Sequence, residues 1–340
     1  MELNALWFII IAFFFIGYFV LEGFDFGVGM ALPFVGGDSE EANDARRTAA
    51  VRSIGPVWDG NEVWLITGGA AIFAAFPEWY ATLFSGFYLP LLLILVSLII
   101  RGVCLEWRVK VDTLSWRKRC DLGIIIGSYV PALLWGVAFA NIVAGVKYTN
   151  DSDIATVADG FFGLLNPLGL VGGLAFLLLF FFHGLLFLGM KTGEPLRSRV
   201  HQMARGGVAF AAVGVGAVFL LWIQFKHGYP WTWVPLILVV AFLAVALYAL
   251  WTGKDGLAFA GTACAIIACG ITLFGALFPD VLPSSNGIGG LDIHNAAASP
   301  YTLKIMTWAA VVLAPAVLIG QGWTYWQFRK RVTVGAAHSA

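Results

Sequence analysis

Long apolar stretches, separated by short polar connections, run through most of the 340-residue sequence. A helix needs about 20 mostly apolar residues to cross roughly 30 Å of hydrocarbon. Nine stretches meet this need, at approximately 5–33, 52–75, 79–103, 121–146, 163–190, 207–226, 232–252, 257–278 and 303–328. They are continuous rather than alternating, which favours helices over a β-barrel. The pattern therefore predicts an all-α polytopic membrane protein with nine transmembrane helices.

The composition restricts the class of protein further. Hydrophobic residues make up 60% of the chain and charged residues 12%, whereas soluble domains carry roughly 25% charged residues. So few charges could not cover a water-soluble domain of this size, and a chain with 28 Phe and 14 Trp is not disordered. No connection is long enough for an extramembrane domain. We expect residues 1–340 to form a single integral-membrane domain with no nucleic-acid partner.

The basic residues divide unequally between the two sets of connections. Seventeen of the 20 Lys and Arg residues, among them Arg101 near the inner end of the third stretch, fall in one set or at the adjoining helix ends. The other set holds Lys147, Lys226 and Lys304. Connections rich in Lys and Arg remain in the cytoplasm. We therefore expect a multi-pass protein whose N-terminus lies outside and whose C-terminus is cytoplasmic.

Four acids lie inside the first two apolar stretches. Glu22 and Asp25 are three positions apart in the first stretch, and Asp59 and Glu62 are three positions apart in the second, so each pair shares one helix face. The two helices run in opposite directions. At 1.5 Å per residue, Asp25 and Asp59 lie roughly 10–12 Å below the cytoplasmic face. The four carboxyls are therefore expected to meet at one depth.

Acids at this depth are costly. One acid near mid-membrane costs about 2.5–3.5 kcal/mol, so four ionised and unpaired acids would cost on the order of 10 kcal/mol. We expect no Lys or Arg at the same depth, with Arg52 nearest at the membrane edge, and therefore expect some of the acids to be protonated. One interpretation is a proton path from the cytoplasm. The other is structural, with the acids hydrogen-bonded to Asn61, Trp58, Trp64 and backbone groups.

The remaining chemistry-bearing residues predict no metal, haem or nucleophile site. His183 alone among the five His residues lies inside an apolar stretch, whereas haem or metal ligation usually needs a second ligand at a suitable depth. We expect His183 to be a polar residue satisfied inside the bundle, with proton handling as the alternative. The four Cys residues show no C-x-x-C pattern and are expected to be small buried apolar groups.

Several sequence blocks occur in an order that matches a known family. They are GFDFGVG at 23–29, PVWDGNEVWL at 56–65, FSGFY at 84–88, GSYVP at 127–131, LNPLGL at 165–170, FP at 278–279, PSS at 283–285 and MTW at 306–308. On these blocks the sequence resembles subunit II of cytochrome bd-type ubiquinol or menaquinol oxidases, over nearly the whole chain. The connection from Lys226 to Trp231 is shorter than in some relatives, which puts in doubt any family feature located there.

The resemblance implies an architecture and a set of partners. It implies nine helices in two four-helix bundles plus one peripheral helix, in a bacterial plasma membrane. It also implies a partner, subunit I, that carries three haems (two b-type and one d-type) and the quinol site, while subunit II binds no haem. Small single-helix accessory subunits, lipid and quinone are further partners of the family. A cytoplasm-facing proton route is implied for subunit II. Its acids match Glu22, Asp25 and Asp59, and the match to the family is weaker at Glu62.

We therefore predict a haem-free subunit II of an electrogenic quinol oxidase that reduces dioxygen to water, with no catalytic residue in this chain alone. The predicted proton carriers are Asp25 and Asp59, with Glu22 as their uptake partner and Glu62 as a further member. Supporting roles are predicted for Trp58, Asn61 and His183. Two alternatives remain open: a proton-coupled membrane transporter that uses the same acids, and a passive scaffold subunit whose acids serve packing.

Overall fold

The computed structural model describes residues 2–148 and 161–334 of the chain, and most of this part is helical. The helices are α1 (Leu3–Ala31), α2 (Glu40–Ile54), α3 (Trp58–Ala75), α4 (Pro77–Gly86), α5 (Tyr88–Trp107), α6 (Leu114–Ala144), α8 (Pro167–Lys191), α9 (Leu196–Met203), η1 (Ala204–Val208), α10 (Ala209–His227), η2 (Pro230–Thr232), α11 (Trp233–Trp251), α12 (Asp255–Leu277) and α13 (Pro300–Gln327). Two short strands, β1 (Asp280–Leu282) and β2 (Leu291–Asp292), pair antiparallel. The expected all-α class is confirmed.

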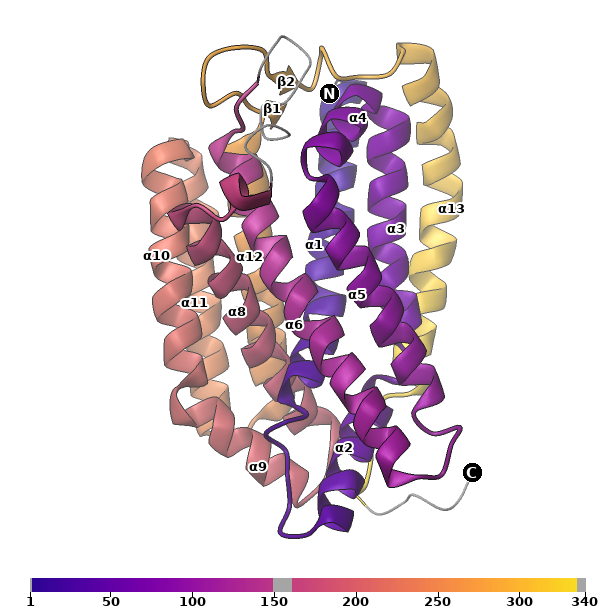
Figure 1. Cartoon of the computed structure of the whole chain (residues 1–340). Coiled ribbons are helices and arrows are strands. Elements are labelled where there is room, and N and C mark those ends of the chain that lie inside the picture. Colours follow the sequence, from indigo (N-terminus) through magenta and orange to yellow (C-terminus); the bar gives the residue numbers. More distant parts are fainter. Residues whose placement is uncertain (1, 149–160, 335–340) are drawn as a thin grey trace.

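Eight helical segments in the described ranges are long and apolar enough to cross a membrane. They are α1, α5, α6, α8, the unit Leu196–His227, the unit Pro230–Trp251, α12 and α13. Helix α3 is not among them, because Asp59, Asn61 and Glu62 lie in its first two turns and lower its mean hydropathy. It nevertheless runs beside α1 and α13 (Figure 1). The chain is therefore a multi-pass membrane protein with eight segments of spanning length and one more polar helix alongside them.

Two of the expected stretches are divided in the structure. The stretch 52–75 contains the end of α2 and the whole of α3, with a break between Ile54 and Trp58. The stretch 79–103 is divided at Phe87 between α4 and α5. Pro90 explains the second break, because a proline in the first turn of α5 has no N–H for the carbonyl one turn back in α4. Apolar character continues through the break, so hydropathy alone predicts a single helix there.

Helix α1 lies in the middle of the bundle and contacts α3, α6, α8 and α12. Its approach to α8 is closest at Gly27 and Gly184: a Cβ on Gly27 would lie 2.1 Å from the carbonyl oxygen of Phe180 and 2.6 Å from the Cα of Gly184. Glycine is therefore required at this crossing, as is usual where membrane helices pack backbone to backbone. The crossing fixes the inner half of α1, which carries two of the predicted acids, against α8.

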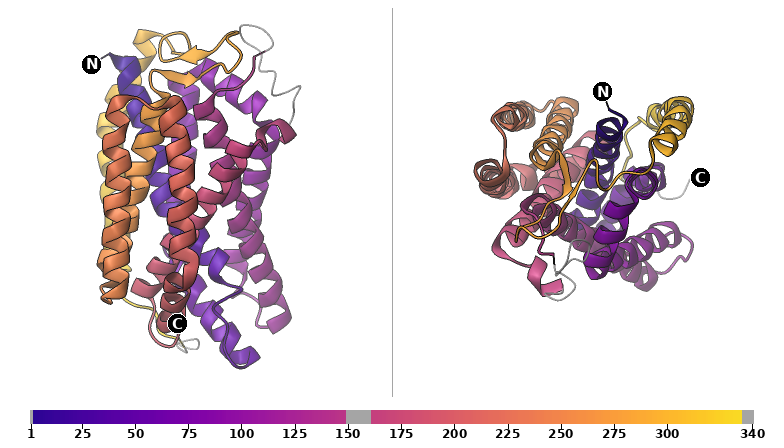
Figure 2. Two further views of the ribbon diagram at one scale, coloured as in Figure 1. Left: turned by 90° about the vertical axis from the view of Figure 1, so that its left-hand side faces the viewer. Right: turned by 90° about the horizontal axis from the view of Figure 1, so that it is seen from above.

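The two ends of the bundle differ in composition. The end that carries α2 and α9 holds ion pairs such as Arg117 with Asp44 and Lys118 with Glu40. The opposite end holds β1, β2 and the start of α1 (Figure 1 and the left view of Figure 2). Helix α13 lies at the edge of the bundle when the molecule is seen from above (Figure 2), and Leu303 is its one buried residue.

Candidate functional site

Two of the predicted acids lie side by side on the inner half of α1. The side chains of Glu22 and Asp25 are both fully buried. Their three-residue spacing places them on one face of α1. On that face Glu22 accepts from Arg101 of α5 and Asp25 accepts from Asn61 of α3, so both acids point into the bundle.

A buried arginine accompanies these acids, and the expectation that no cation lies at their depth is wrong. Arg101 of α5 is fully buried, and its Nη1 donates to Oε1 of Glu22 and, at 3.4 Å, to Oε1 of Glu62. Helix α5 continues to Trp107, so Arg101 lies almost two turns before its end rather than in the cytoplasmic connection. Its guanidinium also lies 4.9 Å from the centre of the Phe26 ring, a cation–π contact.

Close packing of α5 on α6 holds Arg101 in this place. A Cβ on Gly127 of α6 would lie 2.5 Å from the Cβ of Arg101 and 2.6 Å from the carbonyl oxygen of Ser97. Any side chain at 127 would therefore push α5 away and move the guanidinium from the acids. The glycine permits a backbone approach at the level where the ion pair forms.

Asp25 belongs to a second branch of the same polar interior. Asn61 of α3 donates from Nδ2 to Oδ2 of Asp25 at 2.6 Å. Its Oδ1 accepts hydrogen bonds from the hydroxyl of Tyr325 at 2.7 Å and from Nε2 of Gln321 at 3.3 Å. Asn61 therefore bonds Asp25 and connects it to the peripheral helix α13.

Several polar atoms of this group have no protein partner among the described residues. Each buried acid of α1 accepts a hydrogen bond through one carboxyl oxygen, so Oε2 of Glu22 and Oδ1 of Asp25 have no protein partner. Nε and Nη2 of Arg101 also have none. Buried polar atoms almost always need a hydrogen-bond partner. A proton on the carboxyl, or water, would satisfy these atoms, so the arrangement allows the group to bind protons.

Asp59 lies apart from this group, and Trp58 lies beside it without a hydrogen bond to the acids. Asp59 is on the exposed face of α3 and lines a groove there. Trp58 packs against α5 next to Arg101, since a Cβ on Gly102 would lie 3.2 Å from its ring. Arg101 thus joins Glu22 to Glu62, and Asn61 joins Asp25 to α13. Asp59 lies about one helical turn away, at the mouth of the site.

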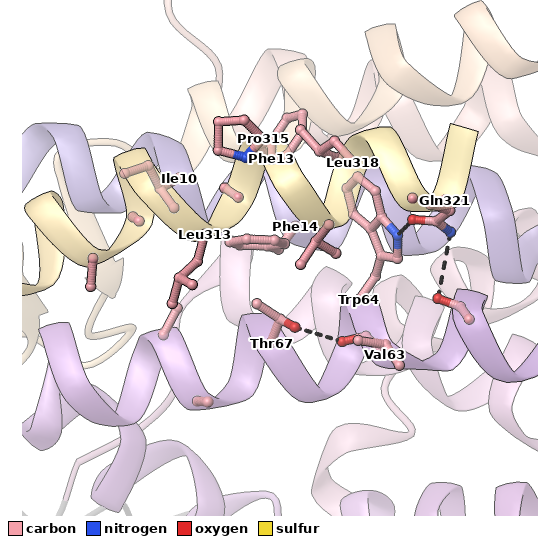
Figure 3. A pocket seen from close by; sticks show the side chains of 18 of the residues that line it. Ile10, Phe13, Phe14, Val63, Trp64, Thr67, Leu313, Pro315, Leu318 and Gln321 are labelled. Atoms are coloured by element: carbon pink, nitrogen blue, oxygen red, sulfur yellow. Dashed lines mark hydrogen bonds between the residues drawn. The ribbon is translucent and has the colours of Figure 1, made fainter. Parts of the chain in front are cut away.

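The groove beside Asp59 has a volume of about 1090 Å³ and lies between α1, α3 and α13 (Figure 3). Most of its lining is apolar, with Phe13 and Leu313 among the side chains that face it. One end is polar: Trp64 Nε1 donates to Oε1 of Gln321 at 2.6 Å, which fastens α3 to α13. Because Gln321 also reaches Asn61, this polar end connects the groove to the buried acids.

His183 of α8 is satisfied inside the bundle, as expected. Its Nδ1 lies 2.7 Å from the hydroxyl of Thr262, and its Nε2 lies 3.2 Å from the carbonyl oxygen of Val20. The ring also stacks on Phe259, with centroids 4.6 Å apart. Both ring nitrogens are therefore engaged. No group of three or more His, Cys, Asp or Glu residues in the described ranges is arranged to hold a metal ion.

A second buried ion-pair group lies between the acids of α1 and the end of the bundle that carries α2. Arg108 is fully buried; its Nε donates to Asp121 Oδ1 at 2.6 Å and its Nη2 to Asp44 Oδ1 at 2.9 Å. Its Nη1 also donates to Thr48 at 2.8 Å. These bonds hold the polar helix α2 against the α5–α6 pair, and they line the inner end of the bundle with exchangeable groups.

Comparison with known proteins decides the family. Residues 3–328 match the family model described as cytochrome bd terminal oxidase subunit II. The chain belongs to this family. It is 40% identical to cytochrome bd ubiquinol oxidase subunit 2 of Bacillus subtilis over 98% of this chain and 97% of that one. It is 36% identical to cytochrome bd-I ubiquinol oxidase subunit 2 of Escherichia coli K12 over 97% of this chain and 95% of that one.

The fold agrees with this membership. The structure of a bd oxidase from Geobacillus thermodenitrificans matches with a TM-score of 0.76 and 19% identity, covering 96% of this chain and 97% of that one. At that identity the likeness shows the fold alone. The predicted resemblance to bd oxidase subunit II is therefore confirmed, and the chain is a subunit of an oxidoreductase complex.

Three members of the site do not stand out in the subunit II sequence. Arg101 lies close enough to the expected end of its stretch to be assigned to the cytoplasmic connection. Gln321 and Tyr325 lie on α13, about 260 positions from Asn61, so nothing local links them to the acids. One feature of the sequence could have identified Arg101 and Gln321 as members of the site. Each is a strongly polar side chain inside an apolar stretch, and such side chains usually face a polar partner inside the protein.

Proposed function

We propose that this chain is the haem-free subunit II of a bd-type quinol:oxygen oxidoreductase in a bacterial plasma membrane. In this proposal it supports a haem-bearing subunit I and carries protons from the cytoplasm towards the site of oxygen reduction. The observation that carries the proposal is the buried group in which Arg101 bonds Glu22 and Glu62 and Asn61 bonds Asp25. Family membership and the names of the relatives support the assignment to a quinol oxidase.

The proposed topology has nine spans, with α3 as the ninth, arranged as two four-helix bundles plus the peripheral helix α13, in one integral-membrane domain. The N-terminus is outside and the C-terminus is cytoplasmic. The basic residues support this orientation: 17 of the 20 belong to connections and helix ends on one side of the membrane. The polar side chains in α3 are compatible with a span because Asn61 is buried and Glu62 is half-buried against neighbouring helices.

Charge balance inside the group supports proton binding. Three carboxyls, those of Glu22, Asp25 and Glu62, share one guanidinium, that of Arg101. One ion pair can be neutral, but two further ionised carboxyls in the same low-dielectric interior would be strongly unfavourable. Binding protons removes these charges. The group therefore holds protons that can be passed on when the charge of a neighbour changes.

The route begins at Asp59, which is exposed in the groove, and continues to the half-buried Glu62 one turn further along α3. From there the contacts lead through Arg101 to Glu22, beside Asp25. Haems in the partner subunit supply the redox chemistry when the complex is assembled. Proton uptake from the cytoplasm, with release of quinol protons outside, stores about 2.3 kcal/mol per charge for each 100 mV of membrane potential.

The contacts of His183 support the haem-free assignment. Both ring nitrogens are engaged by Thr262 and Val20, and the ring is stacked on Phe259, so neither nitrogen is presented to a ligand. One observation favours a second candidate, the passive scaffold: the acids are tied to neighbouring helices by Arg101 and Asn61, which would also serve packing.

Asp25→Asn separates proton transfer from packing. Asparagine keeps an oxygen that accepts from Asn61, so the helix contact survives, but it cannot carry a proton. We expect the purified complex to retain its haem spectrum while quinol oxidase turnover, measured as oxygen consumption, falls at least about tenfold. Glu106→Gln is the matched control, since Glu106 is an exposed acid paired with Lys110 at the cytoplasmic end of α5. Wild-type turnover in Asp25→Asn would favour the scaffold.

A further inference from the structure

The kinked junction of α9 and α10 encloses a hollow at the end of the bundle that carries α2. The junction η1 is widened, and Gly206 and Gly207 leave helical geometry, with φ of +123° at Gly207. The hollow has a volume of about 410 Å³ and is lined by Ser198, His201, Gln202, Arg205 and Gly206. None of its lining residues lines the groove beside Asp59 or bonds the buried acids of α1, so it is separate from the proposed proton route.

Arg205 is held in a fixed position at this hollow. Its Nη2 donates to the carbonyl oxygen of Leu250 at 2.6 Å, and its guanidinium lies 5.6 Å from the centre of the Trp251 ring. Its Nε is buried and has no protein partner among the described residues. A guanidinium held at one edge offers its remaining N–H groups in a planar fork, the geometry that matches a phosphate.

The surroundings of Arg205 are basic. Two acids lie nearby. Asp255 bonds Arg197 and Arg331, both at 2.9 Å, and Glu194 accepts from the hydroxyl of Ser198 at 2.6 Å. Three arginines, Arg197, Arg205 and Arg331, thus accompany two acids, and this excess of positive charge favours an anion.

Two exposed apolar side chains lie on the helices next to the hollow, and one of them, Trp251, contacts Arg205. Trp251 is 61% exposed at the end of α11, and Phe210, one turn beyond Gly206 on α10, is 66% exposed. Exposed Trp residues at helix ends mark the headgroup level of a membrane. A molecule bound here would have its anionic group at Arg205 and apolar chains along α10 and α11.

We propose that this hollow binds the phosphate group of an anionic membrane phospholipid in the cytoplasmic leaflet. Basic pockets between transmembrane helices on that side of a membrane are the usual sites for such headgroups. The leaflet follows from the proposed topology, whereas the site itself depends on neither the redox function nor the proton route. A free phosphate ion shares the recognition chemistry but has nothing to place against Trp251 and Phe210.

The test uses the whole oxidase complex, delipidated and reconstituted in nanodiscs of phosphatidylcholine with a small fraction of phosphatidylglycerol. Native mass spectrometry after release into detergent then counts the retained phosphatidylglycerol. We expect the wild type to retain it and Arg205→Gln to retain about tenfold less. Gln202→Glu places a negative charge at the exposed rim of the hollow and should also lower retention of phosphatidylglycerol. This variant replaces Arg205→Gln in the test if Arg205→Gln fails to assemble.

Arg199→Gln is the matched control. It removes one positive charge on the same helix. Arg199 bonds the carbonyl oxygen of Phe34 at 3.0 Å and, through a longer contact of 3.4 Å, Oε1 of Gln202 at the rim, but it does not itself line the hollow. It should retain phosphatidylglycerol as the wild type does. Equal loss in Arg199→Gln and Arg205→Gln would show diffuse attraction and overturn the site. Displacement of the lipid by an excess of inorganic phosphate would assign the hollow to a free anion and overturn the lipid assignment.

Discussion

The same helices build two different interiors in the two halves of the bundle. Towards β1 and β2, which we call the outer half, α1, α6 and α8 meet through aromatic rings: Phe19 lies 5.0 Å from Phe139 and 5.2 Å from Phe176, edge to face. Towards α2 and α9, the inner half, α1 meets α3 and α5 through Glu22, Asp25 and their partners. Phe19 and Glu22 are three residues apart on α1, about 4.5 Å along the axis.

This contrast separates stability from function. The interior of the outer half is held together by aromatic packing and by neutral hydrogen bonds such as that from Trp135 Nε1 to the Tyr18 hydroxyl, with no buried ion pair among the described residues there. The inner half contains buried charges that well-packed apolar residues could replace without loss of stability. Under the proposed function, these charges serve proton transfer rather than stability. Changes in the outer half should therefore affect assembly, and conservative changes in the inner half should affect turnover.

The largest effect is expected from Arg101→Leu. Removal of the guanidinium leaves Glu22 and Glu62 buried without a counter-charge, which costs about 3–5 kcal/mol. We expect little haem-containing complex in the membrane, measured by visible spectroscopy of solubilised membranes. Arg101→Leu combined with Glu22→Gln should restore much of the assembly, because the uncompensated charge is gone, but not the turnover. Equal loss of assembly in the single and the double variant would contradict the role of this ion pair.

A smaller effect on stability is expected from Phe139→Leu in the outer half. Phe139 contacts Phe15, Phe19, Phe176 and Phe274, and the smaller, differently shaped side chain should lower stability by about 1–2 kcal/mol. The thermal inactivation temperature of the complex should fall, while turnover per haem at moderate temperature stays unchanged. A drop in turnover per haem would contradict the assignment of stability to the outer half and of turnover to the inner half.

The smallest effect concerns the ribbon at the outer end. Asp280 of β1 pairs with Asp292 of β2, and partial burial, followed by the like charge of Asp292, raises the pKa of Asp280 above its usual 3.8. The folded ribbon thus binds this proton more tightly than the unfolded chain. Its stability is highest at low pH and falls as pH rises from 3.8 through the raised folded pKa.

Asp280→Asn should remove this pH dependence. At neutral pH it should stabilise the ribbon by about 0.5 kcal/mol, the scale of a like-charge pair across two strands. Hydrogen exchange of the peptide that contains Val281 and Leu282, in the intact complex, reports this local stability. Protection in the wild type, corrected for the intrinsic pH dependence of amide exchange, that does not change across the acidic range would exclude the effect.

The sequence predicts the helices and the acids of α1 well, because both depend on local patterns. Apolar length indicates a membrane span, and the i, i+3 spacing of Glu22 and Asp25 places them on one face whatever the neighbours are. The breaks at Phe87 and between Ile54 and Trp58 are harder, since apolar residues continue on both sides and hydropathy does not distinguish one helix from two.

The partners of the acids depend on tertiary packing and could not be predicted in the same way. Arg101 reaches Glu22 because Gly127 lets α6 approach α5 closely, a fact about two helices rather than one. Asn61 reaches Tyr325 because α13 returns to the side of α3. The i, i+3 spacing predicts that Asp59 and Glu62 share one face of α3. Residues at this spacing are not fully aligned around the helix axis, and the difference leaves Asp59 in the groove.

Infrared difference spectroscopy tests most directly whether acids in the inner half carry exchangeable protons. A protonated carboxyl has a C=O stretching band that is absent from a carboxylate and moves when its proton is replaced by deuterium. In redox difference spectra of the complex, we predict such a band that shifts in D2O and is lost in Asp25→Asn or Glu22→Gln. If no band in this region depends on those two side chains, the inner acids do not change protonation with the redox state, which would contradict their role as proton carriers.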